Sequence, residues 1–172
     1  MTGQSLKRVT RYLIVTLVML STNGYSAAEE SAVTEAMLDN GMKVLVKQDS
    51  RAPVVVAQVW YRIGSSYEPD GITGVSHVLE HMMFKGTSKY PKGEFNRIIA
   101  ENGGNDNAFT GRDYTAYFQT LEKSRLAVSM ELESDLMRGI FLDKDEFSKE
   151  KNVVIEERRQ RTEDKPERKI YE

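Results

Sequence analysis

Residues 77–95 read HVLEHMMFKGTSKYPKGEF, and both histidines of this 172-residue chain lie among the first five of them. His77 and His81 are four residues apart, so on an α-helix their side chains share one face, about one turn apart. Two imidazoles in that position can bind a single Zn²⁺, with each nitrogen ~2.0–2.1 Å from the metal. Glu80 lies on the same face, where a carboxylate can take a proton from a metal-bound water. The stretch therefore predicts a helix, over residues 74–84, that carries part of a metal centre.

The order His-x-x-Glu-His is a pattern of zinc peptidases, and an ordinary helix with two partly exposed histidines is the alternative. A catalytic zinc usually has three protein ligands and a water. The chain has no cysteine and no third histidine, which leaves aspartate or glutamate as the third ligand. On a helix predicted over residues 145–162, Glu150 and Glu157 lie about 40° and 60° from Val154, the centre of the buried face. Glu156 lies about 160° away and is expected to face solvent.

Two carboxylates that point into a core need a partner, because unpaired buried charge is costly. A shared cation is one such partner. The alternative is that both carboxylates lie at a wet edge of the domain.

The composition excludes several classes of protein. Lys and Arg number 24 against 26 Asp and Glu, a formal net charge of −2, which argues against a strongly basic nucleic-acid binder. The chain has no cysteine, so disulfide scaffolds, thiolate zinc fingers and cysteine nucleophiles are excluded. A hydrophobic fraction of 40% and a charged fraction of 29% are ordinary for a globular protein.

The first 28 residues have the layout of a secretory signal peptide. Three basic residues precede a hydrophobic run at residues 12–20, and small residues follow up to Ala28. The run is far shorter than the ~20 residues that span a bilayer, so no stable membrane span is expected. We therefore predict cleavage after Ala28, a mature domain over residues 29–172 and a periplasmic location. An uncleaved anchor is the alternative.

The rest of the chain predicts an α+β fold, in which antiparallel strand hairpins have helices packed on the sheet. Asn40-Gly41 joins two short β-like runs, residues 34–39 and 42–48, and is a strong hairpin signal. Residues 54–61, VVVAQVWY, predict a buried strand in which Trp60 belongs to the core. The remaining segments are strands at 105–110 and 114–120, a helix at 92–102 ended by Gly103-Gly104, and an amphipathic segment at 121–140.

Three blocks of the sequence resemble one family. HVLEHMMFKGTSKYPKGEF (77–95) is similar to the active-site stretch of the pitrilysin/insulinase zinc metallopeptidases, above all the branch of the mitochondrial processing peptidases and their bacterial relatives. The resemblance continues in GGNDNAFTGRDYTAYF (103–118) and EKNVVIEERRQ (150–160), in the order of the family. It covers nearly all of the chain after Ala28.

The resemblance implies a role for each residue of the motif. His77, His81 and Glu157 would be the ligands of one Zn²⁺, and Glu80 the general base. Glu150 would be a supporting catalytic carboxylate that fixes a ligand from outside the metal's own shell.

The resemblance also implies a substrate-binding strand. Asn107, Ala108, Phe109 and Thr110 match the family's edge strand, which pairs with an extended peptide substrate. Backbone hydrogen bonds of that kind give affinity whatever the peptide's sequence. An ordinary hairpin strand is the alternative for these residues.

Family members consist of two similar halves, each larger than residues 29–172. The chain is therefore expected to be the N-terminal part of one half, with a missing C-terminal half or a partner subunit. The function implied is a zinc-dependent endopeptidase that hydrolyses extended or unstructured peptides. The alternatives are a non-catalytic interaction or peptide-binding subunit of the same fold, and a metal-binding but inactive fragment.

Overall fold

The computed structural model describes residues 32–163, in two units that divide after Arg51. In the first unit, β1 (Val33–Met37) and β2 (Lys43–Lys47) form an antiparallel hairpin. Asn40 Oδ1 accepts a hydrogen bond of 3.0 Å from the Met42 N–H, and Gly41 has φ +83°, which favours glycine. The predicted hairpin is confirmed. The predicted signal peptide, residues 1–28, lies outside the described residues.

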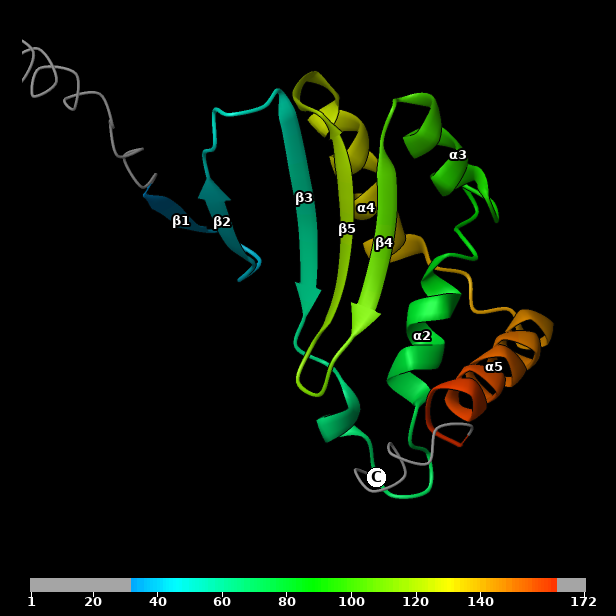
Figure 1. Ribbon diagram of the computed structural model, residues 1–172. Helices are drawn as coiled ribbons and strands as arrows, with labels where there is room; N and C mark the ends of the chain where they lie inside the picture. Colours follow the sequence, from blue (N-terminus) through cyan, green and yellow to red (C-terminus); the bar gives the residue numbers. More distant parts are fainter. Residues whose placement is uncertain (1–31, 164–172) are drawn as a thin grey trace, which may run out of the picture. The chain divides into compact units, whose positions relative to one another are not determined.

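The second unit is built on a three-stranded antiparallel sheet with the order β3-β5-β4 (Figure 1). Its strands are β3 (Val54–Tyr61), β4 (Asn105–Thr110) and β5 (Thr115–Glu122). β4 and β5 form a tight hairpin in which the Gly111 N–H donates to Tyr114 O at 2.8 Å. β5 is therefore the central strand, and β4 is an edge.

Helices cover one face of this sheet, and two others contact β4 while its outer edge has no strand partner among the described residues. They are η1 (Ser65–Tyr67), α2 (Val75–Met83), α3 (Glu94–Glu101), η2 (Lys123–Arg125), α4 (Leu126–Gly139), α5 (Lys144–Arg158) and the π-helical turn η3 (Arg159–Glu163). α4 lies behind the sheet in Figure 1, α2 packs beside β4, and α5 packs on α2. The antiparallel α+β class is as predicted. The amphipathic segment 121–140 is divided, because its first two residues end β5 and the helix begins at Leu126.

The core lies between the sheet and its helices. Its buried side chains come from β5, α2, α3 and α4: Tyr117, Leu121, Met83, Phe95, Ile99, Leu132 and Leu136. Ile99 is 0% exposed and Leu132 is 1% exposed. Burial of one such aliphatic side chain contributes about 1.5–3 kcal/mol, so this layer holds the helices on the sheet.

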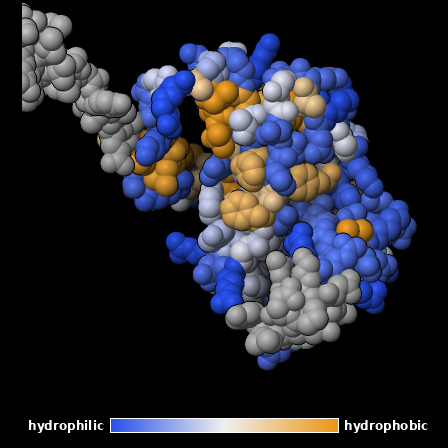
Figure 2. Space-filling view, in the orientation of Figure 1, coloured by the Kyte–Doolittle hydropathy of each residue, from blue (hydrophilic) through white to orange (hydrophobic). Residues whose placement is uncertain are grey.

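The prediction that β3 is a buried strand is wrong for one of its faces. Ala57 is buried, but Val54, Val56 and Trp60 are 53%, 51% and 53% exposed. Among the described residues, helices cover only the opposite face of the sheet, and a continuous apolar run does not reveal this. On the open face Trp60 packs edge-on against Phe109, with ring centroids 5.7 Å apart. Figure 2 shows hydrophobic side chains gathered over this face.

Candidate metal centre

The helix that carries the histidines begins at a charged cap. At the start of α2, the Gly74 N–H donates to Glu68 Oε2 and the Ser76 N–H donates to Glu68 Oε1, both at a distance of 2.7 Å. Burial alone would raise the pKa of Glu68, but these hydrogen bonds stabilise the carboxylate and hold its pKa below the ordinary value. A negative charge at a helix N-terminus also stabilises the helix dipole. Glu68 thus fixes the end of α2 that lies beside His77.

α5 provides the facing carboxylates. Asp143 is its N-cap residue, and Asp143 Oδ1 accepts hydrogen bonds from the N–H groups of Asp145 at 2.9 Å and Glu146 at 2.8 Å. Along α5 the side chains of Glu150 and Glu157 are 12% and 29% exposed and lie against the histidines of α2. Both glutamates therefore face α2 as predicted, although no residue of α5 is fully buried.

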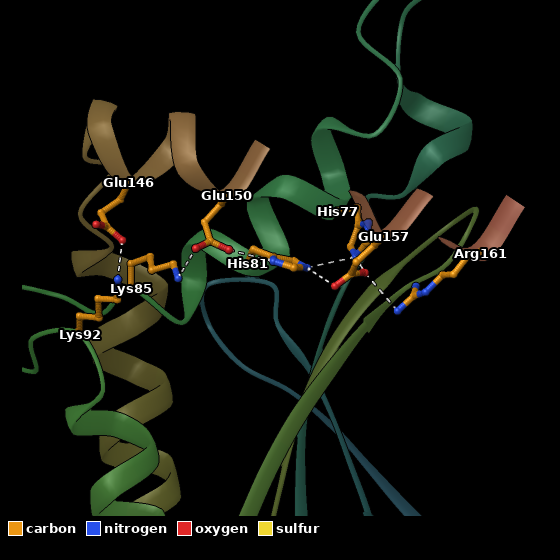
Figure 3. Close-up of polar contacts among 8 residues, drawn as sticks. All are labelled: His77, His81, Lys85, Lys92, Glu146, Glu150, Glu157 and Arg161. Atoms are coloured by element: carbon orange, nitrogen blue, oxygen red, sulfur yellow. Dashed lines mark hydrogen bonds and ion pairs between the residues drawn. The ribbon is translucent and has the colours of Figure 1, made fainter. Parts of the chain in front are cut away.

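Three ligand atoms converge between α2 and α5 (Figure 3). His77 Nε2 lies 3.3 Å from His81 Nε2. The Glu157 carboxylate lies 3.6 Å from His77 Nε2 and 3.8 Å from His81 Nε2. Ligands at ~2.0–2.1 Å from a tetrahedral zinc are themselves ~3.3–3.4 Å apart. The observed separations are close to those values, so the three residues fit one zinc ion without rearrangement of the helices.

The chemistry of Glu157 also fits a cation. Its Oε2 is buried and accepts no hydrogen bond from any described residue, although an Arg161 nitrogen lies 3.1 Å away. The ion pair with Arg161 compensates part of this charge, and a bound cation would compensate it further. His77, in turn, has a lowered pKa, because burial outweighs the carboxylates of Glu80 and Glu157 that act the other way. Neutral imidazole is the form that binds metal.

Glu80 lies beside this trio but outside it. Among the described residues, only His77, His81 and Glu157 form a group that could bind a metal ion. Glu80 Oε2 instead accepts a hydrogen bond from the Thr110 hydroxyl of β4. The carboxylate is thereby held next to the metal site without being a ligand, as a general base requires.

An open cleft of about 1300 Å³ exposes the site. The four residues predicted to bind substrate border this cleft: Asn107, Ala108, Phe109 and Thr110. They belong to β4, whose outer side has no strand partner among residues 32–163. The cleft therefore combines a metal trio, a carboxylate and a free strand edge.

Comparison with known proteins identifies the family. The family described as insulinase (peptidase family M16) matches residues 43–172. This chain belongs to the M16 family. It is 37% identical to the zinc protease PqqE of Helicobacter pylori over 167 residues, which cover 95% of this chain and 38% of that protein. It is 36% identical to the uncharacterized zinc protease YmxG of Bacillus subtilis over 118 residues, 69% of this chain and 29% of that protein.

A solved structure gives the same result for the M16 fold. The crystal structure of a protease from Helicobacter pylori superimposes with a TM-score of 0.79 at 36% identity, over 83% of this chain and 35% of that chain. The chain thus spans well under half the length of these M16 relatives. No helix among the described residues has both the length and the apolar character needed to cross a membrane.

Glu150 connects the candidate metal trio to a neighbouring charge. Its Oε2 accepts from His81 Nδ1 at 3.0 Å, and its Oε1 pairs with Lys85 Nζ at 2.5 Å. Burial opposes ionisation, but Lys85 and His81 outweigh it and lower the pKa of Glu150. With Nδ1 engaged in this way, Nε2 of His81 is directed toward His77 and Glu157.

The sequence predicted that five residues lie together, and the structure places them at one site: His77, Glu80, His81, Glu150 and Glu157. The sequence did not predict two residues that support them, Glu68 and Lys85. Glu68 lies six residues before Gly74, between the strand predicted at 54–61 and the helix predicted at 74–84. An acidic residue shortly before a helix that lacks its own capping side chain was the signal that could have found it. Lys85 pairs with a residue 65 positions away, and no local pattern signals such a contact.

Proposed function

We propose that this chain carries the metal-binding and water-activating part of an M16 zinc endopeptidase. The observation that supports it most is the convergence of His77, His81 and Glu157 at 3.3–3.8 Å, with Glu80 beside them. Those three residues would hold the zinc ion, which when bound supplies a Lewis acid for the scissile carbonyl and lowers the pKa of the attacking water. Glu80 accepts the proton of that water and returns it to the leaving amine.

The neighbouring hydroxyl has a part in this proton transfer. Thr110 donates to Glu80 Oε2, which orients the carboxylate and leaves Oε1 for the water.

We infer that the substrate is an extended peptide. The free edge of β4 offers backbone N–H and C=O groups along one border of the cleft, and an unstructured peptide can add to it as a further strand. A folded protein seldom presents a free segment of this kind. The preference is thus for extended or unstructured peptides of varied sequence.

We also propose a periplasmic enzyme whose site is completed by a second half or a partner subunit. The basic residues and short hydrophobic run within residues 1–28 support export. The greater length of the M16 relatives supports a second contributor to substrate binding.

The central test replaces Glu80 with Gln in the full-length protein. Glu80→Gln should retain zinc and lose ~10²–10⁴-fold in peptide hydrolysis, because the amide keeps the shape but accepts no proton. Glu101→Gln, an exposed glutamate of α3, is the control and should keep both properties. Substantial turnover by Glu80→Gln would remove Glu80 as the base, and loss of zinc would make it a ligand instead.

A further inference from the structure

Two lysine–glutamate pairs join the inner face of α5 to the segment that follows α2 (Figure 3). Lys92 Nζ pairs with Glu146 Oε2 at 2.7 Å, and Lys85 Nζ pairs with Glu150 Oε1 at 2.5 Å. The two pairs have the same chemistry and lie one turn apart on α5. They differ in what the glutamate does with its other oxygen, because only Glu150 also contacts a histidine of the metal trio.

We propose that Lys85 is a positioning residue of the metal centre, which acts on His81 through Glu150. The proposal rests on the proposed zinc site. The ammonium of Lys85 holds Glu150 Oε1, so that Oε2 remains directed at His81 Nδ1. His81 is thereby held in the ring orientation and the tautomer that turn Nε2 toward His77 and Glu157.

Burial makes this pair different from an ordinary surface ion pair. The side chains of Lys85, Glu150 and His81 are 16%, 12% and 19% exposed. Coulombic attraction is weakly screened in such surroundings, and a charge-assisted hydrogen bond is correspondingly strong. Without the ammonium, Glu150 would be a partly buried carboxylate held only through its Oε2 contact with His81, and rotation toward water would become favourable.

The backbone brings Lys85 to this place reproducibly. The Lys85 N–H donates to Met82 O at 3.0 Å, so the residue continues the end of α2. Gly86 follows with φ +87°, and a Cβ there would lie 2.2 Å from Tyr90 O. The chain can turn at this point only with glycine, which fixes the direction in which the Lys85 side chain leaves.

Lys92 provides a matched control. Its side chain is 59% exposed and that of Glu146 is 21% exposed, and the Lys92–Glu146 pair contacts no histidine. Removal of Lys92 therefore breaks a lysine–glutamate contact to the same helix and leaves the Glu150–His81 hydrogen bond intact.

The experiment measures zinc affinity in the full chain by competition with a chromophoric chelator. Lys85→Met should weaken zinc binding about tenfold, the lower end of the range for residues that support metal ligands. Lys85→Arg should restore most of the affinity because the positive charge returns, and Lys92→Met should stay within about twofold of wild type. In a Glu150→Gln background, Lys85→Met should cause no further loss, since Lys85 then has no carboxylate to hold.

The results separate this inference from the metal site on which it rests. A wild-type chain that binds no zinc would overturn the metal centre and the inference together. Zinc affinity of Lys85→Met equal to wild type would overturn the role of Lys85 alone. An equal loss in Lys92→Met, or an undiminished loss from Lys85→Met in the Glu150→Gln background, would show a general effect on α5 and would also overturn it.

Discussion

Glu133 of α4 is a buried carboxylate whose charge the fold does not compensate. Its residue is 4% exposed, and its Oε2 accepts no hydrogen bond from any residue within 32–163. Burial raises its pKa, the negative charge of Asp106 raises it further, and the hydrogen bond from Gln119 Nε2 to Oε1 only partly opposes them. Tyr61 and Tyr117, the other titratable neighbours, also have raised pKa values, so both are neutral. We predict that Glu133→Gln stabilises the protein at alkaline pH.

The sign follows from linkage. A carboxyl whose pKa is higher in the folded than in the unfolded chain favours folding while it is protonated, below its ordinary value of 4.5. That contribution is lost as the pH rises through the folded-state pKa of Glu133. Glutamine stays neutral at every pH, so Glu133→Gln buries no charge when the pH rises. A buried polar group without a partner costs ~1–3 kcal/mol, and more when charged, so the gain in unfolding free energy at pH 8 should be about 1–3 kcal/mol.

Urea unfolding of wild type and Glu133→Gln at a pH near 4.5 and at pH 8 measures this gain, and all other titrations cancel in the difference. Glu131→Gln is the control from the same helix, because Glu131 has a 60% exposed side chain and pairs with Lys89. It should show no gain at pH 8. A Glu133→Gln variant that is less stable than wild type at pH 8, or whose gain is the same at both pH values, would refute the reasoning.

Two further predictions concern the ends of the chain. Glu157→Gln should lose most of the bound zinc, whereas Glu156→Gln, at a position whose side chain is 57% exposed, should keep it; metal analysis of both variants decides this, and the reverse result would contradict the ligand assignment. N-terminal sequencing of the exported protein should begin at Glu29, because the small residues before it fit a cleavage site; an intact Met1 on a membrane-bound species would instead mean an anchor.

Local sequence signals predicted most of the fold. They failed where the same hydrophobic pattern is compatible with either a strand or a helix. Asn40-Gly41 and Gly103-Gly104 determine turns through backbone conformations that few other residues adopt, so the hairpin and the end of α3 were predictable. Leu121 was predicted to belong to an amphipathic segment but lies in β5, next to its last residue. It is 1% exposed, and an apolar residue at that place satisfies strand and helix periodicity equally. The burial of β3 depends on what covers each face of the sheet, which the strand's own residues do not encode.

The residues of the candidate site likewise fall into two groups, those that local sequence predicts and those that only the tertiary structure reveals. The positions of His77, Glu80 and His81 follow from one turn of one helix, and helical geometry alone predicts that they share a face. The Lys85–Glu150 pair depends on how α5 lies on α2, so it emerges only from tertiary structure.

The direction of the α5 glutamates could be predicted on an incomplete argument. The sequence predicts a buried face centred on Val154, yet no residue of the helix is fully buried, and Val153 and Ile155 are 44% and 41% exposed. The half-buried positions are instead Glu146, Glu150, Val154 and Glu157, spaced four, four and three residues apart. Three carboxylates on one face repel each other and cannot hold a helix in place by hydrophobic burial. Lysines pair with the first two, and Arg161 pairs with Glu157, whose Oε2 is buried and accepts no well-aligned hydrogen bond from the described residues. A cation bound by Glu157 and the two histidines would therefore supply docking energy for α5 as well as chemistry, so that the contacts that form the site also complete the fold.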